Sequence, residues 1–286
     1  MKKVAPLLAN LFFCVTLLAQ TGKVFDNLSV KSKILNVDRK FAIYLPPDYE
    51  ISQRSYPVLY LLHGGGDDQT GWIQFGEVQN ITDKAIREGI ATPMIIVMPD
   101  AFTIRKGFSN DIKNTWRYED FFFQELIPFI EKNYRAKTEK RYRAVAGLSM
   151  GGEGTFIYAL HHPEMFAAAC PLSGSTGPLT PDSARATFKK ETTPIADTTI
   201  MAYYKRQSVL ELVNNMADSV KKSVRWYIDC GDDEIYYEGN CLVHIAMRKK
   251  DIPHEFRVRD GGHNWTYWRA SLTPVLEFVS ISFHQF

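Results

Sequence analysis

The chain has 286 residues, 45% of them hydrophobic and 13% aromatic, which is enough to build one domain of catalytic size around a sizeable core. Its 34 basic residues nearly balance 32 acidic ones, so no basic surface for nucleic acid is expected. Cys170, Cys230 and Cys241 do not have the spacing of a metal site; buried free thiols are expected, with a Cys230–Cys241 disulfide as the alternative.

The first twenty residues are typical of a secretory signal peptide. Lys2 and Lys3 precede an apolar stretch that is too short to span a bilayer and that ends in small and polar residues. We therefore expect cleavage of 1–20 to leave an exported, periplasmic or secreted chain of 21–286, which carries no net charge and has no stable membrane insertion. An uncleaved anchor and a buried first helix are the alternatives.

Apolar, β-rich runs alternate with amphipathic stretches along the rest of the chain, and several of these runs are continuously apolar, as strands covered on both faces must be. This alternation predicts an α/β fold with a mostly parallel central sheet and helices on both faces, and 24–45 should form an antiparallel edge. Strands are predicted over 41–46, 56–63, 93–99, 142–147, 166–174, 224–231 and 254–262, and helices over 119–134, 151–163, 207–222 and 239–251.

Residues 175–205 interrupt the alternation. They contain three prolines and many threonines and show no clear period. We expect an insertion over the carboxyl end of the sheet, which is either a surface excursion or a lid or substrate wall.

Ser149 lies in the sequence GLSMGG, between a predicted strand and a predicted helix. A chance Gly-x-Ser-x-Gly match in a chain of this length occurs on the order of one time in ten, so the flanking elements carry the argument. A sharp strand-to-helix turn leaves little room for side chains at Gly147 and Gly151 and exposes the serine hydroxyl. We predict that Ser149 is a nucleophile and that the Met150 N–H stabilises the oxyanion. The alternative is a glycine-rich turn with an idle serine.

A nucleophilic serine needs a base, and the base needs an acid to orient it. In α/β hydrolases these follow in the order serine, acid, histidine, each after a later strand. His263, in GGHNW, is predicted to be the general base and acid. The usual spacing, three residues after Gly231, favours Glu234 as the acid, with Asp233 and then Asp232 as alternatives.

The three glycines of LLHGGGDD follow an apolar strand, where a backbone N–H can approach a ligand closely. The Gly65 N–H is predicted to join Met150 in an oxyanion hole. A phosphate-cradling loop is the competing interpretation, but the Gly-Lys-Ser/Thr that it requires is absent.

Several aromatic residues are close in sequence to these loops. Trp72 follows the glycines, and Trp265 and Trp268 follow His263. Together they could line a cleft for an aromatic acyl group or a sugar ring, although each one singly is more typical of a protein core.

The segments RKFAIYLPPDY, HGGGDDQTGW, YEDFFFQELIPFIEKNYR, AGLSMGG and GGHNWTYWR resemble the putative esterase family of α/β hydrolases, from about residue 24 to the C-terminus. That family includes feruloyl and acetyl xylan esterases of carbohydrate esterase family one, S-formylglutathione hydrolases, siderophore esterases and mycolyltransferases. The resemblance implies Ser149 as nucleophile, His263 as base, backbone donors at Gly65 and Met150, and no metal or organic cofactor. The chain departs from many relatives, which carry Asp, in having Glu234 at the acid position.

These observations predict a secreted serine carboxylic ester hydrolase that acts on feruloyl or acetyl groups of plant polysaccharide. The partner is expected to be a small-molecule or oligosaccharide ester. Three alternatives stay open: an acyltransferase of the mycolyltransferase type, an S-formylglutathione hydrolase-like thioesterase, and a non-catalytic carbohydrate-binding module.

Overall fold

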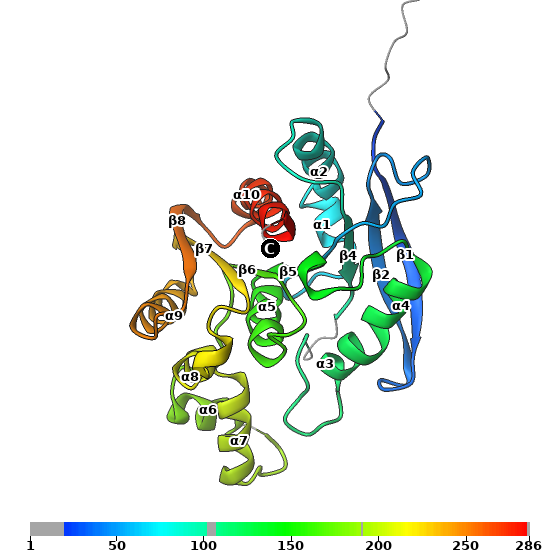
Figure 1. The fold of residues 1–286 in the computed structure, drawn as a ribbon. Coiled ribbons are helices and arrows are strands. Elements are labelled where there is room, and N and C mark those ends of the chain that lie inside the picture. The colour runs from blue at the N-terminus through cyan, green and yellow to red at the C-terminus, as the bar shows by residue number, and fades with distance from the viewer. Residues whose placement is uncertain (1–19, 102–106, 190, 285–286) are drawn as a thin grey trace, which may run out of the picture.

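The computed structural model describes residues 20–101, 107–189 and 191–284, and the predicted signal segment lies almost wholly outside these ranges. The described residues form one eight-stranded sheet in the order β1-β2-β4-β3-β5-β6-β7-β8 (Figure 1). The strands are β1 (Lys23–Ser32), β2 (Val37–Leu45), β3 (Val58–Leu62), β4 (Ile95–Pro99), β5 (Arg143–Leu148), β6 (Ala168–Leu172), β7 (Arg225–Asp233) and β8 (His254–Gly262).

The strand directions agree with the predicted fold class. β1 pairs with β2 and β2 with β4 in antiparallel register, which confirms the antiparallel edge predicted for 24–45. All pairs from β4 through β3, β5, β6 and β7 to β8 are parallel. Consequently the carboxyl ends of six neighbouring strands, and the loops that follow them, meet at one edge of the sheet.

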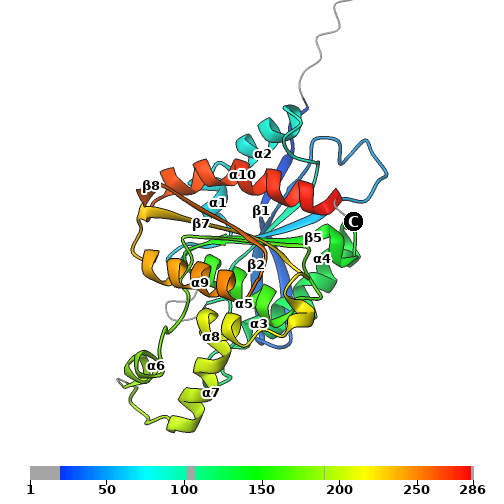
Figure 2. The same cartoon turned by 60° about the vertical axis from the view of Figure 1, so that its left-hand side comes forward.

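The two faces of the sheet carry separate hydrophobic cores. In β3, Val58, Tyr60 and Leu62 join one core and Leu59 and Leu61 the other, as the two-residue period of a strand requires. Figure 2 shows the two helical layers on either side of the sheet. One face is covered by α1 (Gly71–Gln74), α2 (Val78–Arg87) and α10 (Trp265–His284), and the other by α3 (Tyr118–Phe121), α4 (Ile127–Asn133), α5 (Met150–His161), α8 (Val209–Asn214) and α9 (Tyr237–Lys249).

The helix predicted over 119–134 forms as α3 and α4 joined through a π-helical turn, η1 (Phe122–Leu126). By contrast, the helix predicted over 207–222 is wrong in extent, since α8 is short and only a 3₁₀ turn, η3 (Asp218–Val220), follows it.

The insertion predicted at 175–205 contains two helices, α6 (Pro181–Phe188) and α7 (Asp197–Gln207), which project from the body beside α8 (Figure 1). These helices lack a clear hydrophobic period in the sequence, but α6 has a recognisable N-terminal capping motif. Thr180 accepts a hydrogen bond from the Ser183 N–H, Ser183 accepts one from the Thr180 N–H, and Pro181 occupies the first helical position. The hairpin has its own small core of Ala184, Ile200 and Tyr204.

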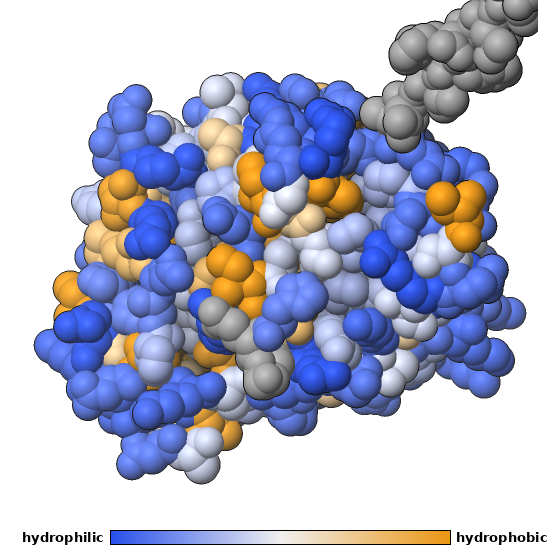
Figure 3. Space-filling model, turned by 45° about the horizontal axis from the view of Figure 1, so that its top comes forward, coloured by the Kyte–Doolittle hydropathy of each residue, from blue (hydrophilic) through white to orange (hydrophobic). Residues whose placement is uncertain are grey.

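The surface and the thiols are ordinary for an α/β domain. The face seen in Figure 3 is mostly hydrophilic, with apolar side chains in small separate patches.

Cys170, Cys230 and Cys241 are free, the first two buried, so the alternative Cys230–Cys241 disulfide is absent. No helix among the described residues is long and apolar enough to cross a membrane.

Candidate active site

Ser149 occupies a strained turn between β5 and α5. Its φ of 55° and ψ of −116° lie outside the usual regions for an L-residue. The neighbouring positions must be glycine because a side chain there would clash with the backbone. A Cβ at Gly147 would lie 2.5 Å from the Gly151 carbonyl oxygen, and a Cβ at Gly151 would lie 2.6 Å from the carbonyl oxygens of Leu62 and His63. The sequence GLSMGG therefore forms the predicted elbow, with the serine at the carboxyl edge of the sheet.

The structure brings the three predicted triad residues together. The His263 Nε2 lies 2.9 Å from the Ser149 Oγ, and the His263 Nδ1 lies 2.6 Å from the Glu234 Oε1. A carboxylate can only accept a hydrogen bond, so Nδ1 carries the proton and Nε2 is left to accept from the serine hydroxyl. This is the tautomer that a general base needs.

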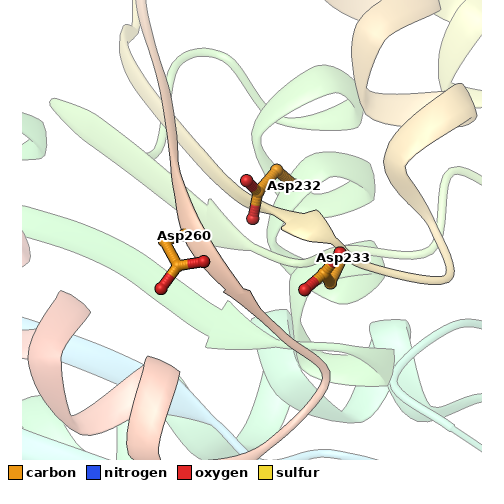
Figure 4. A group of neighbouring side chains, drawn as sticks. All are labelled: Asp232, Asp233 and Asp260. Carbon is orange, nitrogen blue, oxygen red and sulfur yellow. The ribbon is translucent and has the colours of Figure 1, made fainter.

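The geometry selects Glu234 over its two acidic neighbours. The Glu234 side chain is fully buried against His263, whereas Asp232 and Asp233 are exposed. Figure 4 shows the two aspartates on β7 turned toward Asp260 on β8, and the three carboxylates lie within 4.8 Å of one another. Asp232 also accepts a hydrogen bond of 2.9 Å from the Gly261 N–H. The aspartates thus belong to a solvated cluster rather than to the relay.

Glu234 remains ionised despite its burial. Burial alone would raise the pKa of Glu234, but the hydrogen bond from His263 and the neighbouring Ser173 hydroxyl, together with the backbone N–H of Tyr236, lower this pKa below its ordinary value. An ionised Glu234 favours the imidazolium that forms when Ser149 loses its proton.

The HGGG loop passes over the nucleophile. A Cβ at Gly64 would lie 2.6 Å from the Leu148 Cδ1 and 3.6 Å from the Ser149 Cβ, whereas a Cβ at Gly65 would meet nothing within 4 Å. Met150 is the first residue of α5, where backbone N–H groups have no partner within the helix. Gly64 thus brings the HGGG loop close to Ser149, and the role of the Gly65 and Met150 N–H groups as oxyanion donors stays a prediction.

His63 supports this loop and was missed by the sequence interpretation, although it begins the HGGG sequence itself. Its ring is 1% exposed, and its Nδ1 donates to the Gly64 carbonyl at 2.8 Å while its Nε2 accepts from the Ala101 N–H at 3.0 Å. Burial lowers the pKa of His63 to about 4, so the ring is neutral at pH 7, as both contacts require. The contacts tie the glycine loop to the end of β4.

Of the three tryptophans predicted to bind substrate, two are buried and one is partly exposed. Trp72 is 0% exposed and donates to the Leu62 carbonyl at 3.0 Å, so its prediction as a substrate-binding residue is wrong. Trp268 is 5% exposed and packs edge-on against His263 at 4.8 Å between ring centroids, so it too supports the site from within the core. Trp265 is partly exposed and packs against Trp72 and Phe75, so it remains available at the surface.

Ser173 is a second residue that the sequence interpretation missed. It is fully buried with a φ of 44°, and its hydroxyl accepts a hydrogen bond from the Trp268 Nε1 at 3.2 Å while contacting Glu234. Ser173 thereby joins the acid to the tryptophan that packs on His263. The serine in PLSG has no local pattern that distinguishes it from a strand-end residue, so only the tertiary structure reveals it.

A buried network fixes the elements on either side of His263. Asp229 on β7 is 0% exposed and accepts hydrogen bonds from Tyr227, Arg259 and Tyr267. Because Arg259 lies on β8 and Tyr267 in the first turn of α10, this carboxylate joins β7, β8 and α10, and Glu234 and His263 lie in the loops that directly follow β7 and β8.

An open α/β sheet with a serine on a strained elbow, a histidine and a buried carboxylate defines the class of α/β hydrolases with a serine triad. The comparison with known families agrees: residues 32–279 match the model of the family described as "Putative esterase". The chain therefore belongs to this family.

Individual relatives are similar to different extents. An endo-1,4-beta-xylanase/feruloyl esterase of Xylanibacter ruminicola is 42% identical over 139 residues, which are 47% of this chain and 19% of the relative. A solved ferulic acid esterase is 35% identical with a TM-score of 0.80, and the match covers 92% of this chain and 99% of that one. The S-formylglutathione hydrolase of Rattus norvegicus is 26% identical, and the match covers 87% of this chain and 89% of the rat enzyme.

The first of these relatives is much longer than the segment it shares with this chain. The match spans about a fifth of its length, and an esterase of Mycobacterium tuberculosis, 41% identical over 136 residues, is matched over 28% of its length.

Proposed function

We propose that this protein is an exported serine esterase that removes feruloyl or acetyl groups from plant polysaccharide. The observation that carries the esterase activity is the unbroken relay from Ser149 through His263 to Glu234, with contacts of 2.9 and 2.6 Å. The similarity to a ferulic acid esterase over nearly the whole chain supports the acyl group, and the predicted signal segment at 1–20 supports export.

The chemistry follows from the geometry of the relay. His263 takes the hydroxyl proton as the Ser149 Oγ attacks the ester carbonyl, and the Gly65 and Met150 N–H groups stabilise the resulting oxyanion. When the tetrahedral intermediate collapses, the C–O bond to the alcohol breaks and His263 returns the proton to the departing oxygen. Water then repeats the sequence on the acyl-enzyme, so that the free acid leaves and Ser149 is restored.

A substrate panel tests the proposed substrate class. The purified protein is assayed on methyl ferulate, acetylated xylan and feruloylated arabinoxylan fragments, and we expect ferulate or acetate release from the polysaccharide fragments. A protein that hydrolyses simple esters but releases neither acid from these fragments would contradict the polysaccharide substrate.

A thioesterase of the S-formylglutathione hydrolase type is the second candidate. It is favoured by the rat enzyme, which aligns with this chain over most of both lengths. Including S-formylglutathione in the panel separates the two, since a kcat/KM that is highest for the thioester would favour this candidate.

Export is tested separately by the mature N-terminus. Expression in a bacterium with a secretion pathway, followed by intact-mass measurement of the exported fraction, should give a chain that begins near residue 21. A full-length chain found only in the cytoplasm would contradict export without affecting the esterase activity.

A further inference from the structure

Glu153 is a carboxylate close to the nucleophile that the reaction above does not use. It lies in the first turn of α5, and its backbone N–H donates to the Ser149 carbonyl at 3.0 Å. The residue is only partly exposed, and burial raises the pKa of its side chain. A carboxylate is costly to hold in such a place unless hydrogen-bond donors compensate for the lost water.

The loop after β6, residues 174–177, joins Glu153 to the rest of the site. The Ser175 N–H donates to the same Ser149 carbonyl at 3.3 Å, and the Ser175 hydroxyl hydrogen-bonds the Glu153 carboxylate. This loop is also in direct backbone contact with α8 and with the end of α7 in the projecting hairpin. The Val209 N–H donates to the Thr176 carbonyl at 3.0 Å, and a Cβ at Gly177 would lie 2.2 Å from the Gln207 carbonyl oxygen.

The hairpin brings a tyrosine to this place. Tyr203 lies one turn before Gln207 on α7, is partly exposed, and packs edge-on against Phe188 of α6 at 5.2 Å. Burial and the charge of Glu153 raise the pKa of Tyr203 to about 12, which keeps the phenol protonated. Tyr203 therefore carries a protonated hydroxyl one turn from the point where Gln207 meets Gly177 of the loop.

A second tyrosine, Tyr236, is linked to the same loop through Asn240 and contacts the base. The Asn240 Nδ2 donates to the carbonyls of both Gly174 and Tyr236 at 2.9 Å. The Tyr236 ring, also partly exposed, lies 5.5 Å from the His263 imidazole in an edge-to-face arrangement. Glu153 raises the pKa of Tyr236 as well, after the larger effect of burial.

Glu153, Ser175, Tyr203 and Tyr236 thus form a partly exposed group, here called the polar corner, that reaches from the hairpin to the base. His263 must protonate the departing alcohol oxygen, so side chains that contact His263 from the open side face the alcohol half of the ester. A carboxylate can accept from two hydroxyls, and tyrosines offer both an apolar ring face and a hydroxyl, which suits a ligand with several hydroxyl groups.

We propose that the polar corner binds hydroxyl groups of the sugar that carries the ester, with Glu153 as the principal acceptor. The proposal rests on the proposed function and deepens it, because it makes the hairpin of α6 and α7 a wall for the alcohol half of the substrate. It also makes Glu153, in the first turn of α5, a specificity-determining residue.

The test compares one acyl group on two alcohols. kcat/KM is measured for methyl ferulate and for ferulate esterified to an arabinose-containing xylan oligosaccharide, with the wild type, Glu153→Gln and Tyr203→Phe. The loss of a hydrogen bond to a charged acceptor should lower kcat/KM for the sugar ester about tenfold or more in Glu153→Gln. Methyl ferulate, which has no sugar, should change by less than about threefold. Tyr203→Phe should show the same selective loss to a smaller degree.

Glu88→Gln, at an exposed position after α2, is the matched control and should leave both substrates unchanged. An equal loss on both substrates in Glu153→Gln would overturn the proposal, because it would mean that Glu153 positions Ser149. Unchanged kinetics on both would overturn it too. If Glu153→Gln does not fold, Tyr203→Phe decides by the same criteria. A wild type that hydrolyses methyl ferulate but not the sugar ester would reject the polysaccharide substrate together with the polar corner, whereas active wild type with unaffected variants rejects the corner alone.

Discussion

The triad acid depends on which of three adjacent carboxylates is buried. Glu234 has a fully buried side chain and contacts His263 at 2.6 Å, while Asp232 and Asp233 remain in solvent. Only a buried carboxylate gains a strong interaction with the imidazolium, because water screens the others. Local sequence could rank the three by spacing but could not show which side chain turns inward.

Substitution of the acids should separate them by activity. Glu234→Ala is expected to lower kcat by about two to four orders of magnitude, because His263 loses the partner that fixes its tautomer. Asp233→Ala, the matched control one residue earlier, should keep kcat within about twofold. Steady-state kinetics on a 4-nitrophenyl ester measures both, and a comparable loss in Asp233→Ala would contradict the assignment.

At the scale of elements, the site depends on how closely α5 approaches β3. Gly147 and Gly151 let the backbone of the elbow contact Leu62 and His63 directly, and Gly152 lets the helix approach Gly174, where a Cβ would be 2.6 Å from its Cα. This approach sets Ser149 under the HGGG loop.

A methyl group at Gly151 should therefore disturb the fold. Gly151→Ala is expected to lower the free energy of unfolding by about 2 kcal/mol or more, which corresponds to a fall of several degrees in Tm. Gly65→Ala is the control for stability, since its Cβ would meet nothing within 4 Å. Thermal unfolding followed by circular dichroism measures both, and equal Tm values for the two variants would argue against the close approach.

Elements whose residues are determined by local composition could be predicted from the sequence, whereas elements that depend on tertiary packing could not. Buried strands such as β5 and the turn at Ser149 between β5 and α5 can be predicted from the sequence, because their composition is dictated locally. The hairpin of α6 and α7 did not, because its helices pack mainly on each other and lack a long amphipathic period. The prediction of Trp72 and Trp268 as cleft residues is wrong because proximity in sequence to a catalytic loop does not say whether a ring is buried or faces solvent.

At the scale of the whole molecule, a hydrogen-bonded cluster of one glutamate and two histidines joins the hairpin to the body. Glu119 of α3 lies 2.7 Å from the His161 Nδ1 and 3.3 Å from the His162 Nε2, both at the end of α5. The His161 Nε2 in turn donates to the Arg206 carbonyl of α7 at 2.9 Å. Burial would raise the pKa of Glu119, but the hydrogen bonds from the two histidines lower it from 4.5 to about 2.

This cluster predicts a defined loss of stability in acid. Because the folded-state pKa of Glu119 lies below its ordinary value, its stabilisation is complete above about pH 4.5 and is lost as the pH falls from there toward 2. A shift of this size corresponds to a contribution on the order of 3 kcal/mol. Glu119→Gln should therefore be less stable than the wild type at pH 7, and the difference should shrink below pH 4.5.

Urea unfolding from pH 7 to 3 measures this difference. Glu164→Gln is the matched control, since Glu164 also neighbours His162 but its side chain is 67% exposed, and it should follow the wild type throughout. A difference between Glu119→Gln and the wild type that stays constant with pH would contradict the role of the cluster.

Covalent labelling of the serine addresses the central claim, that Ser149 is the nucleophile of an esterase relay. The wild type, Ser149→Ala and Ser173→Ala are incubated with a fluorophosphonate, and the adduct is located by peptide mass spectrometry while ester hydrolysis is followed in parallel. We predict one adduct on Ser149 in the wild type, no adduct in Ser149→Ala, and a loss of at least about a thousandfold in its turnover. Ser173→Ala should still be labelled on Ser149. An adduct on another residue, or near-normal hydrolysis by Ser149→Ala, would contradict the account.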